Sequence, residues 1–224
     1  MIYVMSDIHG NMRRYKDILR QIHLKKNDHL YVLGDVIDRG KYGLPILMDL
    51  IRRPNATVLL GNHEHMMLEA LQTNDPNKLY LWHMNGGSVT HARYKHCSNE
   101  YRQRVIEIIQ RMPINIDVCC QGTNYLLVHG GPLKLGKSLP DPVAESVWHR
   151  LEDDEPMPAG KKVIFGHTPT MHYQYGHPLS IYHGTDKIGI DCGSAYSSYR
   201  KGRLGCLRLD DMKEFYSSLP EPQY

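Results

Sequence analysis

Three short apolar runs, each followed by a helix-like pattern, constrain the fold of this chain more than any other feature. The runs lie at residues 2–5, 30–33 and 56–60. Apolar side chains then recur at helical spacing over residues 12–22 and 44–52, and a third helix is expected to begin near Glu64. Strands that alternate with helices in this way predict a parallel sheet with right-handed crossovers.

The second half of the chain has a different pattern, in which short strands follow one another without long helices between them. It begins after residues 75–112, a segment without strand signals that we interpret as a small helical cap. Five strands are expected beyond the cap, at residues 114–119, 125–128, 162–165, 187–190 and 204–209. These strands predict a second, mixed sheet.

The two halves together predict an α/β fold of mixed α+β character. Two mixed β-sheets are expected to pack face to face as a sandwich, with helices on both outer faces. A chain of 224 residues is long enough for one well-filled core and short for two. We therefore expect a single catalytic domain over residues 1–224, with the cap at about 75–112 as part of it.

Composition argues against several classes of protein. The formal net charge is only +3 and the basic pairs are scattered, so no nucleic-acid partner is expected. The five cysteines are odd in number and lack C-x-x-C spacing, which favours a reducing compartment. No apolar run reaches the roughly 18 residues of a membrane span. We expect a cytoplasmic protein without a membrane partner, and the oligomeric state stays open.

Each of the three early strands ends in a short polar motif that contains glycine. The motifs read Ser6-Asp7-Ile8-His9-Gly10, Gly34-Asp35-Val36-Ile37-Asp38-Arg39-Gly40 and Gly61-Asn62-His63-Glu64. Two later strands end in the same way, at His129-Gly130-Gly131 and Gly166-His167. Because neighbouring parallel strands end at the same edge of a sheet, we expect the motifs to converge on one crevice.

The converging side chains form a set of oxygen and imidazole donors: Asp7, His9, Asp35, Asn62, His129 and His167. The set contains no thiolate, so it suits ions such as Mn, Fe or Zn better than a structural cysteine–zinc site would. One shared carboxylate can bridge two ions, and two ions about 3.5–4 Å apart activate a bridging water for in-line attack on phosphorus. Two divalent metal ions are the predicted cofactors, and phosphoryl transfer is the predicted chemistry.

The same motifs supply groups that suit a phosphate monoester. A monoester dianion needs positive charge beyond the metals, and the guanidinium of Arg39 can grip two phosphate oxygens. The departing alkoxide needs a proton, for which His63 is the candidate donor. Asp38 is placed to orient His63 and to favour its imidazolium form. Hydrolysis of phosphate monoesters by a metal-bridging hydroxide is the predicted reaction.

The motifs resemble those of the calcineurin-like metallophosphoesterases, and within them the phosphoprotein phosphatase branch, whose patterns are GD-x-HG, GD-x-x-DRG and GNHE. The one departure in these three motifs is Ser6 in place of the first glycine, which removes no ligand. The segment Trp82-His83-Met84-Asn85-Gly86-Gly87 resembles the compact bacterial and phage-type members. The resemblance implies a serine/threonine protein phosphatase, active also on phosphotyrosine in some members, with a phosphorylated protein or peptide as its partner.

Roles for individual residues follow from the same resemblance. It implies that Asp35 bridges the two ions. Asp7, His9 and His167 would hold one ion or complete the pair, and Asn62 and His129 would complete the second site. Manganese is the expected ion, with iron or zinc as alternatives. Arg150 is implied as a second phosphate-binding arginine, although an arginine late in a helix also complements the helix dipole without any ligand.

Three other functions stay open. Symmetrical dinucleoside tetraphosphate hydrolases resemble this chain, but they typically have aspartate after the motif histidine and a changed residue before the second-loop arginine. Here Glu64 and Asp38 follow the phosphatase pattern. A phosphodiesterase or nuclease shares the metal ligands but has less need of two arginines. A catalytically inactive interaction module is the third alternative.

The remaining histidines have no comparable setting, so we interpret them as surface or core residues. They are His23, His29, His65, His83, His91, His96, His149, His172, His177 and His183.

Overall fold

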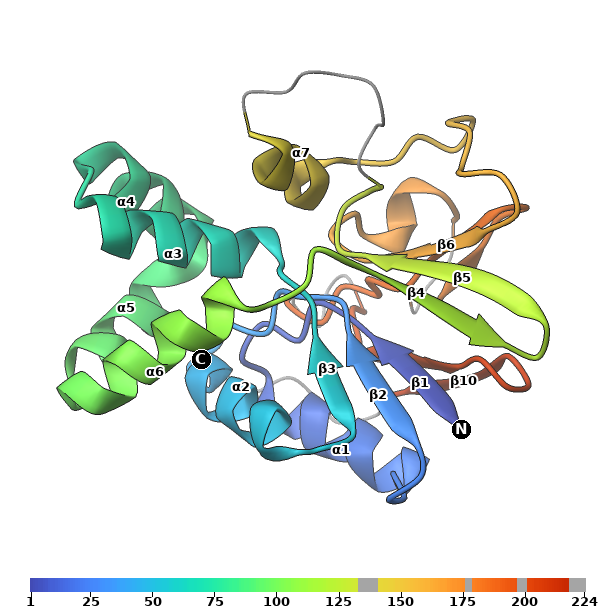
Figure 1. Ribbon diagram of the computed structural model, residues 1–224, viewed down its shortest axis with the longest axis horizontal. Helices are drawn as coiled ribbons and strands as arrows, with labels where there is room; N and C mark the ends of the chain where they lie inside the picture. Colours follow the sequence, from blue (N-terminus) through green and yellow to red (C-terminus); the bar gives the residue numbers. More distant parts are fainter. Residues whose placement is uncertain (133–140, 176–178, 197–200, 218–224) are drawn as a thin grey trace.

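The structure of the chain is a computed structural model that describes residues 1–132, 141–175, 179–196 and 201–217. The predicted fold class is confirmed, since two mixed β-sheets pack together with helices around them (Figure 1). His177 lies outside the described residues.

The first sheet is built on the three predicted parallel strands: β1 (Ile2–Met5), β2 (His29–Val32) and β3 (Ala56–Val58). The crossovers between them are the helices α1 (Met12–Ile22) and α2 (Gly43–Arg52). The side chain of Asn11 caps the start of α1, and His23 ends this helix in the left-handed conformation. The apolar spacing thus predicted both helices, and the structure adds a side-chain cap at the start of α1.

Two antiparallel strands complete the first sheet, β9 (Gly205–Arg208) and β10 (Lys213–Tyr216), in the order β10-β9-β1-β2-β3. The sequence analysis placed residues 204–209 in the second sheet, and that assignment is wrong. β9 pairs with β1, where Leu207 lies opposite Val4. An apolar run indicates that a strand is buried but does not specify which strand it pairs with.

The second sheet has the order β4-β5-β6-β8-β7. Its strands are β4 (Asn115–Cys120), β5 (Thr123–Val128), β6 (Lys162–Phe165), β7 (Tyr182–His183) and β8 (Lys187–Gly189). The three central strands are parallel, and β4 and β7 are antiparallel edge strands. The sequence analysis did not predict β7, which is two residues long.

Alternation along β1 explains how one short strand contributes to two cores. Val4 points between the sheets and packs with Leu127 and Ile164 of the second sheet. Its neighbours Tyr3 and Met5 point the other way, into the core beneath α1 and α2. Because both faces of β1 are covered, its residues form a continuous apolar run.

The outer face of the second sheet is covered mainly by an irregular segment. Leu151 packs there against Val163 and Phe165. Lys187 on β8 is almost fully buried, and its Nζ donates hydrogen bonds to the backbone oxygens of residues 152, 153 and 155 at 2.7–2.9 Å. A single buried ammonium group therefore fixes the path of this segment.

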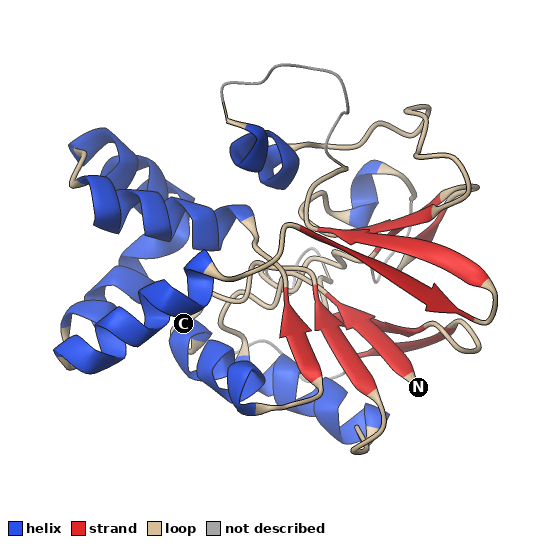
Figure 2. Ribbon diagram, in the orientation of Figure 1, coloured by secondary structure: helices blue, strands red, loops and turns tan. Residues whose placement is uncertain are grey.

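Helices gather on the opposite side of the molecule from the strands of the second sheet (Figures 1 and 2). They are α3 (Asn62–Thr73), α4 (Pro76–Trp82), a π-helical turn (His83–Gly87), α5 (Ser88–Lys95) and α6 (Asn99–Gln110). The short α7 (Pro142–Trp148) packs on α3, and a 3-10 turn (Thr170–His172) follows β6. α3 begins two residues earlier than predicted, so that Asn62 and His63 form its first turn.

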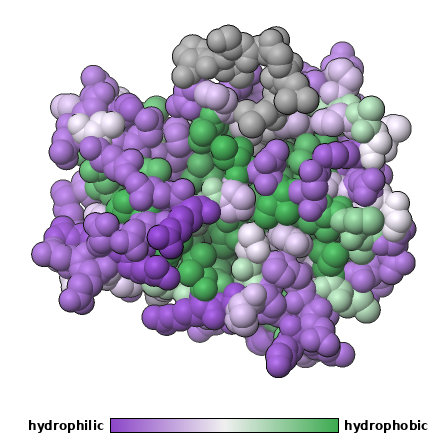
Figure 3. All heavy atoms as spheres, in the orientation of Figure 1, coloured by the Kyte–Doolittle hydropathy of each residue, from purple (hydrophilic) through white to green (hydrophobic). Residues whose placement is uncertain are grey.

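In the view of Figure 3, hydrophilic residues cover most of the helices at the left and the lower edge, and hydrophobic residues come to the surface mainly in the middle. No helix within the described ranges has the length and apolar character needed to cross a membrane.

Candidate metal centre

The carboxyl ends of β1, β2 and β3 point into the middle of the molecule, where α3 begins (Figure 2). Asp7 and His9 follow β1, Asp35 follows β2, and Asn62 opens α3 after β3. The second sheet delivers its two histidines to the same place, directly after β5 and β6. All six predicted ligands are buried and lie together: Asp7, His9, Asp35, Asn62, His129 and His167.

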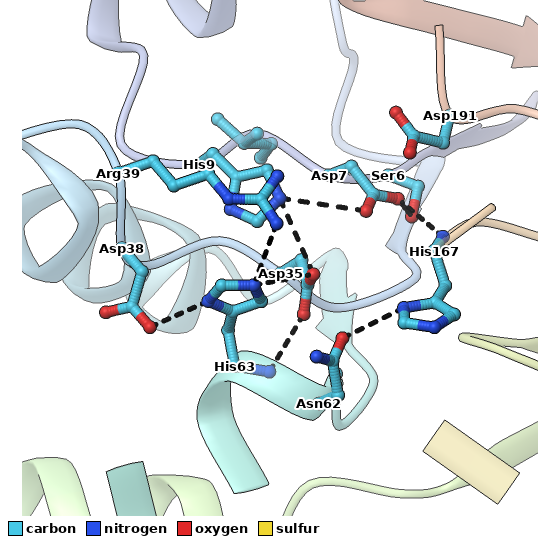
Figure 4. Close-up of polar contacts among 12 residues, drawn as sticks. Ser6, Asp7, His9, Asp35, Asp38, Arg39, Asn62, His63, His167 and Asp191 are labelled. Carbon is cyan, nitrogen blue, oxygen red and sulfur yellow. Dashed lines mark hydrogen bonds and ion pairs between the residues drawn. The ribbon is translucent and has the colours of Figure 1, made fainter. Parts of the chain in front are cut away.

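Asp35 lies at the middle of this group (Figure 4). Its Oδ2 is 3.5 Å from Nε2 of His9, and its Oδ1 is 3.3 Å from Nε2 of His129. The two oxygens of one carboxylate therefore face two different imidazoles, as a carboxylate that bridges two ions requires.

The second imidazole group also contains Asn62 and His167. Oδ1 of Asn62 is 3.0 Å from Nε2 of His129 and 3.0 Å from Nδ1 of His167. Nitrogen atoms of His129 and His167 lie with an Asp35 oxygen in one cluster whose atoms are all within 4.8 Å of one another. The imidazole of His167 thus lies with Asn62 and His129, while its backbone N–H donates to Oδ2 of Asp7 at 3.1 Å. The resemblance implied a different grouping, in which His167 joined Asp7 and His9.

Backbone carbonyls set the orientation of two of the imidazole rings. Nδ1 of His9 is 3.1 Å from the backbone oxygen of Ile37, and Nδ1 of His129 is 2.6 Å from that of Leu33. Since a carbonyl oxygen only accepts, Nδ1 carries the hydrogen in both rings and the lone pair of Nε2 faces Asp35. This is the arrangement that a metal-binding histidine needs.

The titration behaviour of the group fits a site for cations. Burial, and then the charge of Asp35, raise the pKa of Asp7 to about 6. Burial, and then the neighbouring His129, lower the pKa of His167 to about 2. The buried Nε2 of His167 has no hydrogen-bond partner among the described residues. Crowded carboxylates beside neutral imidazoles form a donor set that two divalent ions would complete.

The loops that carry these ligands have an unusual backbone. Six residues of the site that are not glycine have positive φ, between 47° and 68°: Asp7, His9, Asp35, Asp38, Arg39 and His167. This region is unfavourable for side chains with a Cβ atom, so the surrounding structure must hold it. The first two loops bond to each other, with the N–H of His9 donating to the oxygen of Asp35 at 2.9 Å.

Glu64 fixes the backbone of the loop that follows β2. Its buried carboxylate accepts hydrogen bonds from the backbone N–H groups of Asp35 and Val36 at 2.9 Å, and of Ile37 and Gly61 at 3.2 Å. The sequence analysis used Glu64 only to distinguish between families. The structure adds that this side chain fixes the backbone around Asp35.

Asp191 is a neighbour of the centre that the sequence analysis did not assign to the site. It is buried, and burial followed by the charge of Asp7 raises its pKa well above the ordinary value. Figure 4 places it beside Asp7 and His167. The signal was the position of Ile190-Asp191-Cys192-Gly193 at the end of a strand, where the other motifs also occur.

Asp38, His63 and Arg39 lie against one side of the centre (Figure 4). Nδ1 of His63 is 2.8 Å from Oδ2 of Asp38, and Nη2 of Arg39 is 3.2 Å from Nε2 of His63. Burial alone would lower the pKa of His63, but Asp35 and Asp38 outweigh it and the pKa is raised. Asp38 and His63 are buried while Arg39 is exposed, so the guanidinium is open to a ligand from solvent.

Arg150 is exposed and lies two residues beyond the end of α7, so it does not lie within a helix. None of the ion pairs in the described part of the chain involves it, although its charge helps to lower the pKa of His167. Trp148, two residues before Arg150, packs edge-on against His167, with ring centroids 6.0 Å apart. The segment that carries Arg150 is therefore near the second imidazole group.

Two packed mixed sheets with histidines and carboxylates gathered at their strand ends are the features of metal-dependent phosphoesterases. Sequence comparison makes the assignment specific. The chain belongs to the calcineurin-like phosphoesterase family, whose model matches residues 1–190, and it is a hydrolase.

The relatives that the chain matches include two kinds of enzyme. The chain is 28% identical over 222 residues to serine/threonine-protein phosphatase 2 of Escherichia coli, covering 93% of this chain and 92% of that protein. It is 35% identical to a symmetrical bis(5'-nucleosyl)-tetraphosphatase of Haemophilus ducreyi, over 31% of this chain and 26% of that protein.

Solved structures support the fold. A Saccharomyces cerevisiae serine/threonine phosphatase with similarity to human PP5 superimposes with a TM-score of 0.63 at 14% identity, covering 100% of this chain and 80% of that one. A structure with a provisional diadenosine tetraphosphatase assignment gives 0.67 at 18% identity, covering 96% and 91%.

Proposed function

We propose that this protein is a dinuclear-metal phosphomonoesterase that acts on phosphoserine and phosphothreonine in proteins. The observation that carries the proposal is the contact of His63 with both Asp38 and Arg39 beside the candidate metal centre. A proton donor and an exposed guanidinium on the same side of a metal site are what a monoester dianion and its alkoxide leaving group need.

In this proposal the six ligands hold two divalent ions, with manganese expected and iron or zinc as alternatives. Asp35 would contribute to both sites; Asp7 and His9 would complete the first, and Asn62, His129 and His167 would complete the second. When bound, the ions supply the positive charge that activates a water and stabilises the phosphate oxygens.

The protein side chains then have separate tasks. Arg39 binds phosphate oxygens from the solvent side, and Arg150 is the candidate for a second such contact. His63 donates the proton from Nε2 to the leaving oxygen, since its Nδ1 is held by Asp38. The buried carboxylate of Asp38 keeps the ring oriented and its protonated form stable.

The protein substrate is supported by similarity along nearly the whole chain to a bacterial serine/threonine phosphatase. A phosphorylated protein is therefore the proposed partner, and the cytoplasm is the proposed location. Activity on phosphotyrosine belongs to the same proposal, because nothing in the Arg39–His63–Asp38 group selects against an aryl ester.

A symmetrical dinucleoside tetraphosphatase is the second candidate, favoured by the shorter matches to such enzymes. Glu64 argues for the first candidate. Its carboxylate reaches the backbone N–H groups of Asp35, Val36 and Ile37. The aspartate typical of the second candidate is one methylene shorter and would not make the same contacts without a shift of the loop.

The deciding experiment compares kcat/KM for a phosphoserine peptide and for diadenosine tetraphosphate, with metal-stripped protein reconstituted in turn with Mn²⁺, Fe²⁺, Zn²⁺ and Mg²⁺. We expect Mn²⁺ to restore the greatest activity and the peptide to be the better substrate. A strong preference for diadenosine tetraphosphate would contradict the proposal. So would faster cleavage of bis-p-nitrophenyl phosphate than of p-nitrophenyl phosphate.

A further inference from the structure

The indole of Trp82, at the end of α4, reaches from the helical side of the molecule to the carboxylate of Asp38. We propose that Trp82 is a positioning residue for the proton donor: it holds Asp38 in place and, through Asp38, holds His63. The activity test of this inference rests on the proposed function, whereas its spectroscopic test does not.

One oxygen of Asp38 accepts both hydrogen bonds. Oδ2 is 2.8 Å from Nε1 of Trp82 and 2.8 Å from Nδ1 of His63. An indole N–H can only donate, and an ionised carboxylate oxygen can only accept. The shared oxygen therefore faces two donors, which places a hydrogen of His63 on Nδ1. The other ring nitrogen, Nε2, lies 3.2 Å from Nη2 of Arg39, on the side proposed for the substrate.

Trp82 supplies the buried carboxylate of Asp38 with a hydrogen bond that water cannot supply. Asp38 and Trp82 both have 0% exposure, and Oδ1 of Asp38 has no hydrogen-bond partner among the described residues. A buried carboxylate with too few donors is costly and adopts other rotamers to find them. Without the indole N–H, Asp38 would keep His63 as its single side-chain donor and lose its fixed orientation.

The turn after α4 is built to keep the indole in this position. A Cβ atom on Gly87 would lie 2.2 Å from Nε1 of Trp82, so a glycine lets the backbone lie against the indole. On its other sides the indole contacts the rings of His83 and His91, at centroid distances of 5.9 and 5.2 Å. These two histidines, which the sequence analysis treated as ordinary surface or core residues, bond to each other at 2.8 Å.

The same helical region also fixes the backbone of the second loop. The N–H of Asp38 donates to Oγ1 of Thr90 at 3.0 Å, and the N–H of Arg39 donates to the oxygen of Gly86 at 3.0 Å. Residues 82–90 thus hold the side chain of Asp38 and the main chain on both sides of it. A segment far from the metal ligands in sequence contributes directly to the geometry of the proton donor.

A positioning role has a signature that a general structural role lacks. A serine alkoxide is a poor leaving group and needs the proton from His63, whereas p-nitrophenolate leaves without one. Displacement of Asp38 and His63 should therefore slow the peptide reaction and spare the aryl ester. Loss of metal or of fold would slow both reactions.

The variant Trp82→Phe keeps the aromatic ring and removes the N–H. We expect kcat for a phosphoserine peptide to fall about 10-fold, by the loss of one hydrogen bond to a charged group. We expect kcat for p-nitrophenyl phosphate to fall less than about 3-fold, since its departure does not need the proton. KM and bound metal should be unchanged.

Tyr94→Phe is the matched control, because it also removes one donor from a buried aromatic residue of the same helical region. The hydroxyl of Tyr94 donates to the backbone oxygen of Arg102 and does not reach Asp38. Equal kcat for the peptide in Trp82→Phe and Tyr94→Phe would overturn the inference. Equal slowing of both substrates by Trp82→Phe, or a loss of metal, would also overturn it.

A measurement without turnover tests the contact itself. The chain has two tryptophans, so its proton NMR spectrum contains two indole N–H resonances, which Trp82→Phe assigns. We expect the Trp82 resonance to lie downfield and to exchange slowly with water, and Asp38→Asn to shift it while leaving that of Trp148 in place. A Trp82 resonance that exchanges fast, or that Asp38→Asn does not move, would contradict the inference even if the proposed substrate proved wrong.

Discussion

The candidate metal centre and the site of Lys187 are both buried and polar, but their polar groups find partners in opposite ways. Nζ of Lys187 donates to three backbone oxygens, one for each of its N–H bonds. At the metal centre, Nε2 of His167 has no partner among the described residues, and Asp7 and Asp35 repel each other. Buried polarity that is fully hydrogen bonded stabilises a fold, whereas buried polarity without partners indicates a ligand.

The largest effect is expected from Asp35→Asn, which removes the shared charge. Metal content should fall and turnover should drop on the order of 10³-fold or more. If the candidate centre is destabilised by its crowded carboxylates, the free energy of unfolding of the metal-free protein should not fall, because the variant relieves the repulsion between residue 35 and Asp7. Metal analysis and urea unfolding check both expectations, with Asp49→Asn at the half-buried pair with Arg53 as the control. A variant that retains both ions and normal turnover would refute the assignment of Asp35.

His63→Asn should separate binding of the ions from chemistry. Because this side chain is the proposed proton donor and is not among the proposed ligands, the variant should retain its metal and lose turnover by about 10²–10⁴-fold. Metal analysis and kcat for a phosphoserine peptide provide the measurement. Loss of the ions together with activity would place His63 among the ligands instead.

Lys187→Met should show the opposite behaviour. It leaves three buried carbonyl groups without their donor, so the free energy of unfolding should fall by about 2–4 kcal/mol. The metal content of the folded protein should not change. Lys161→Met is the control, because Lys161 forms an exposed pair with Asp117 that should contribute less than about 1 kcal/mol. A similar loss of unfolding free energy in both variants would show that the buried hydrogen bonds of Lys187 stabilise the fold no more than an exposed ion pair does.

The smallest predicted effect concerns pH. Burial and Asp35 raise the pKa of Asp7 from 3.8 to about 6, so the folded metal-free protein binds this proton more tightly than the unfolded chain. Its contribution to stability is present below about pH 4 and is lost as pH rises through about 6. Bound cations favour the deprotonated carboxylate, so stabilisation by Mn²⁺ should grow over the same interval.

Thermal unfolding with Mn²⁺ and with a chelator tests this expectation. The difference in Tm between the two conditions should be larger near pH 7.5 than near pH 5, by about 5 °C. In Asp7→Asn the pH dependence of this difference should be much reduced. A difference that does not vary with pH in the unchanged protein would show that repulsion at the centre is not a source of instability.

The sequence predicted the parts of the fold that depend on local pattern. The β-α-β-α-β order could be predicted because the apolar spacing of elements such as α1 lies within the elements themselves. The position of β9 beside β1 could not, since its buried Cys206 and Leu207 suit either sheet. Strand β10 reads Lys-Glu-Phe-Tyr, which has no clear alternation, and so it was not predicted.

At the candidate site, too, some features could be predicted from the sequence and others could not. Its ligands were predicted because each follows a strand, and the topology of parallel strands brings strand ends together. The contacts of Trp82 with Asp38 and of Glu64 with the second loop were not predicted. The first joins residues 44 positions apart and the second joins residues 27–29 positions apart. Both depend on side-chain directions that no spacing rule encodes.

The placement of the two tryptophans has a practical consequence. Trp82 bonds to Asp38 on one side of the centre, and Trp148 packs edge-on against His167 on the other. These are the only indoles in the chain, so its ultraviolet emission comes mainly from fluorophores that touch the site. We therefore expect binding of ions at the candidate centre to change this emission, which would allow it to be followed in real time without a label.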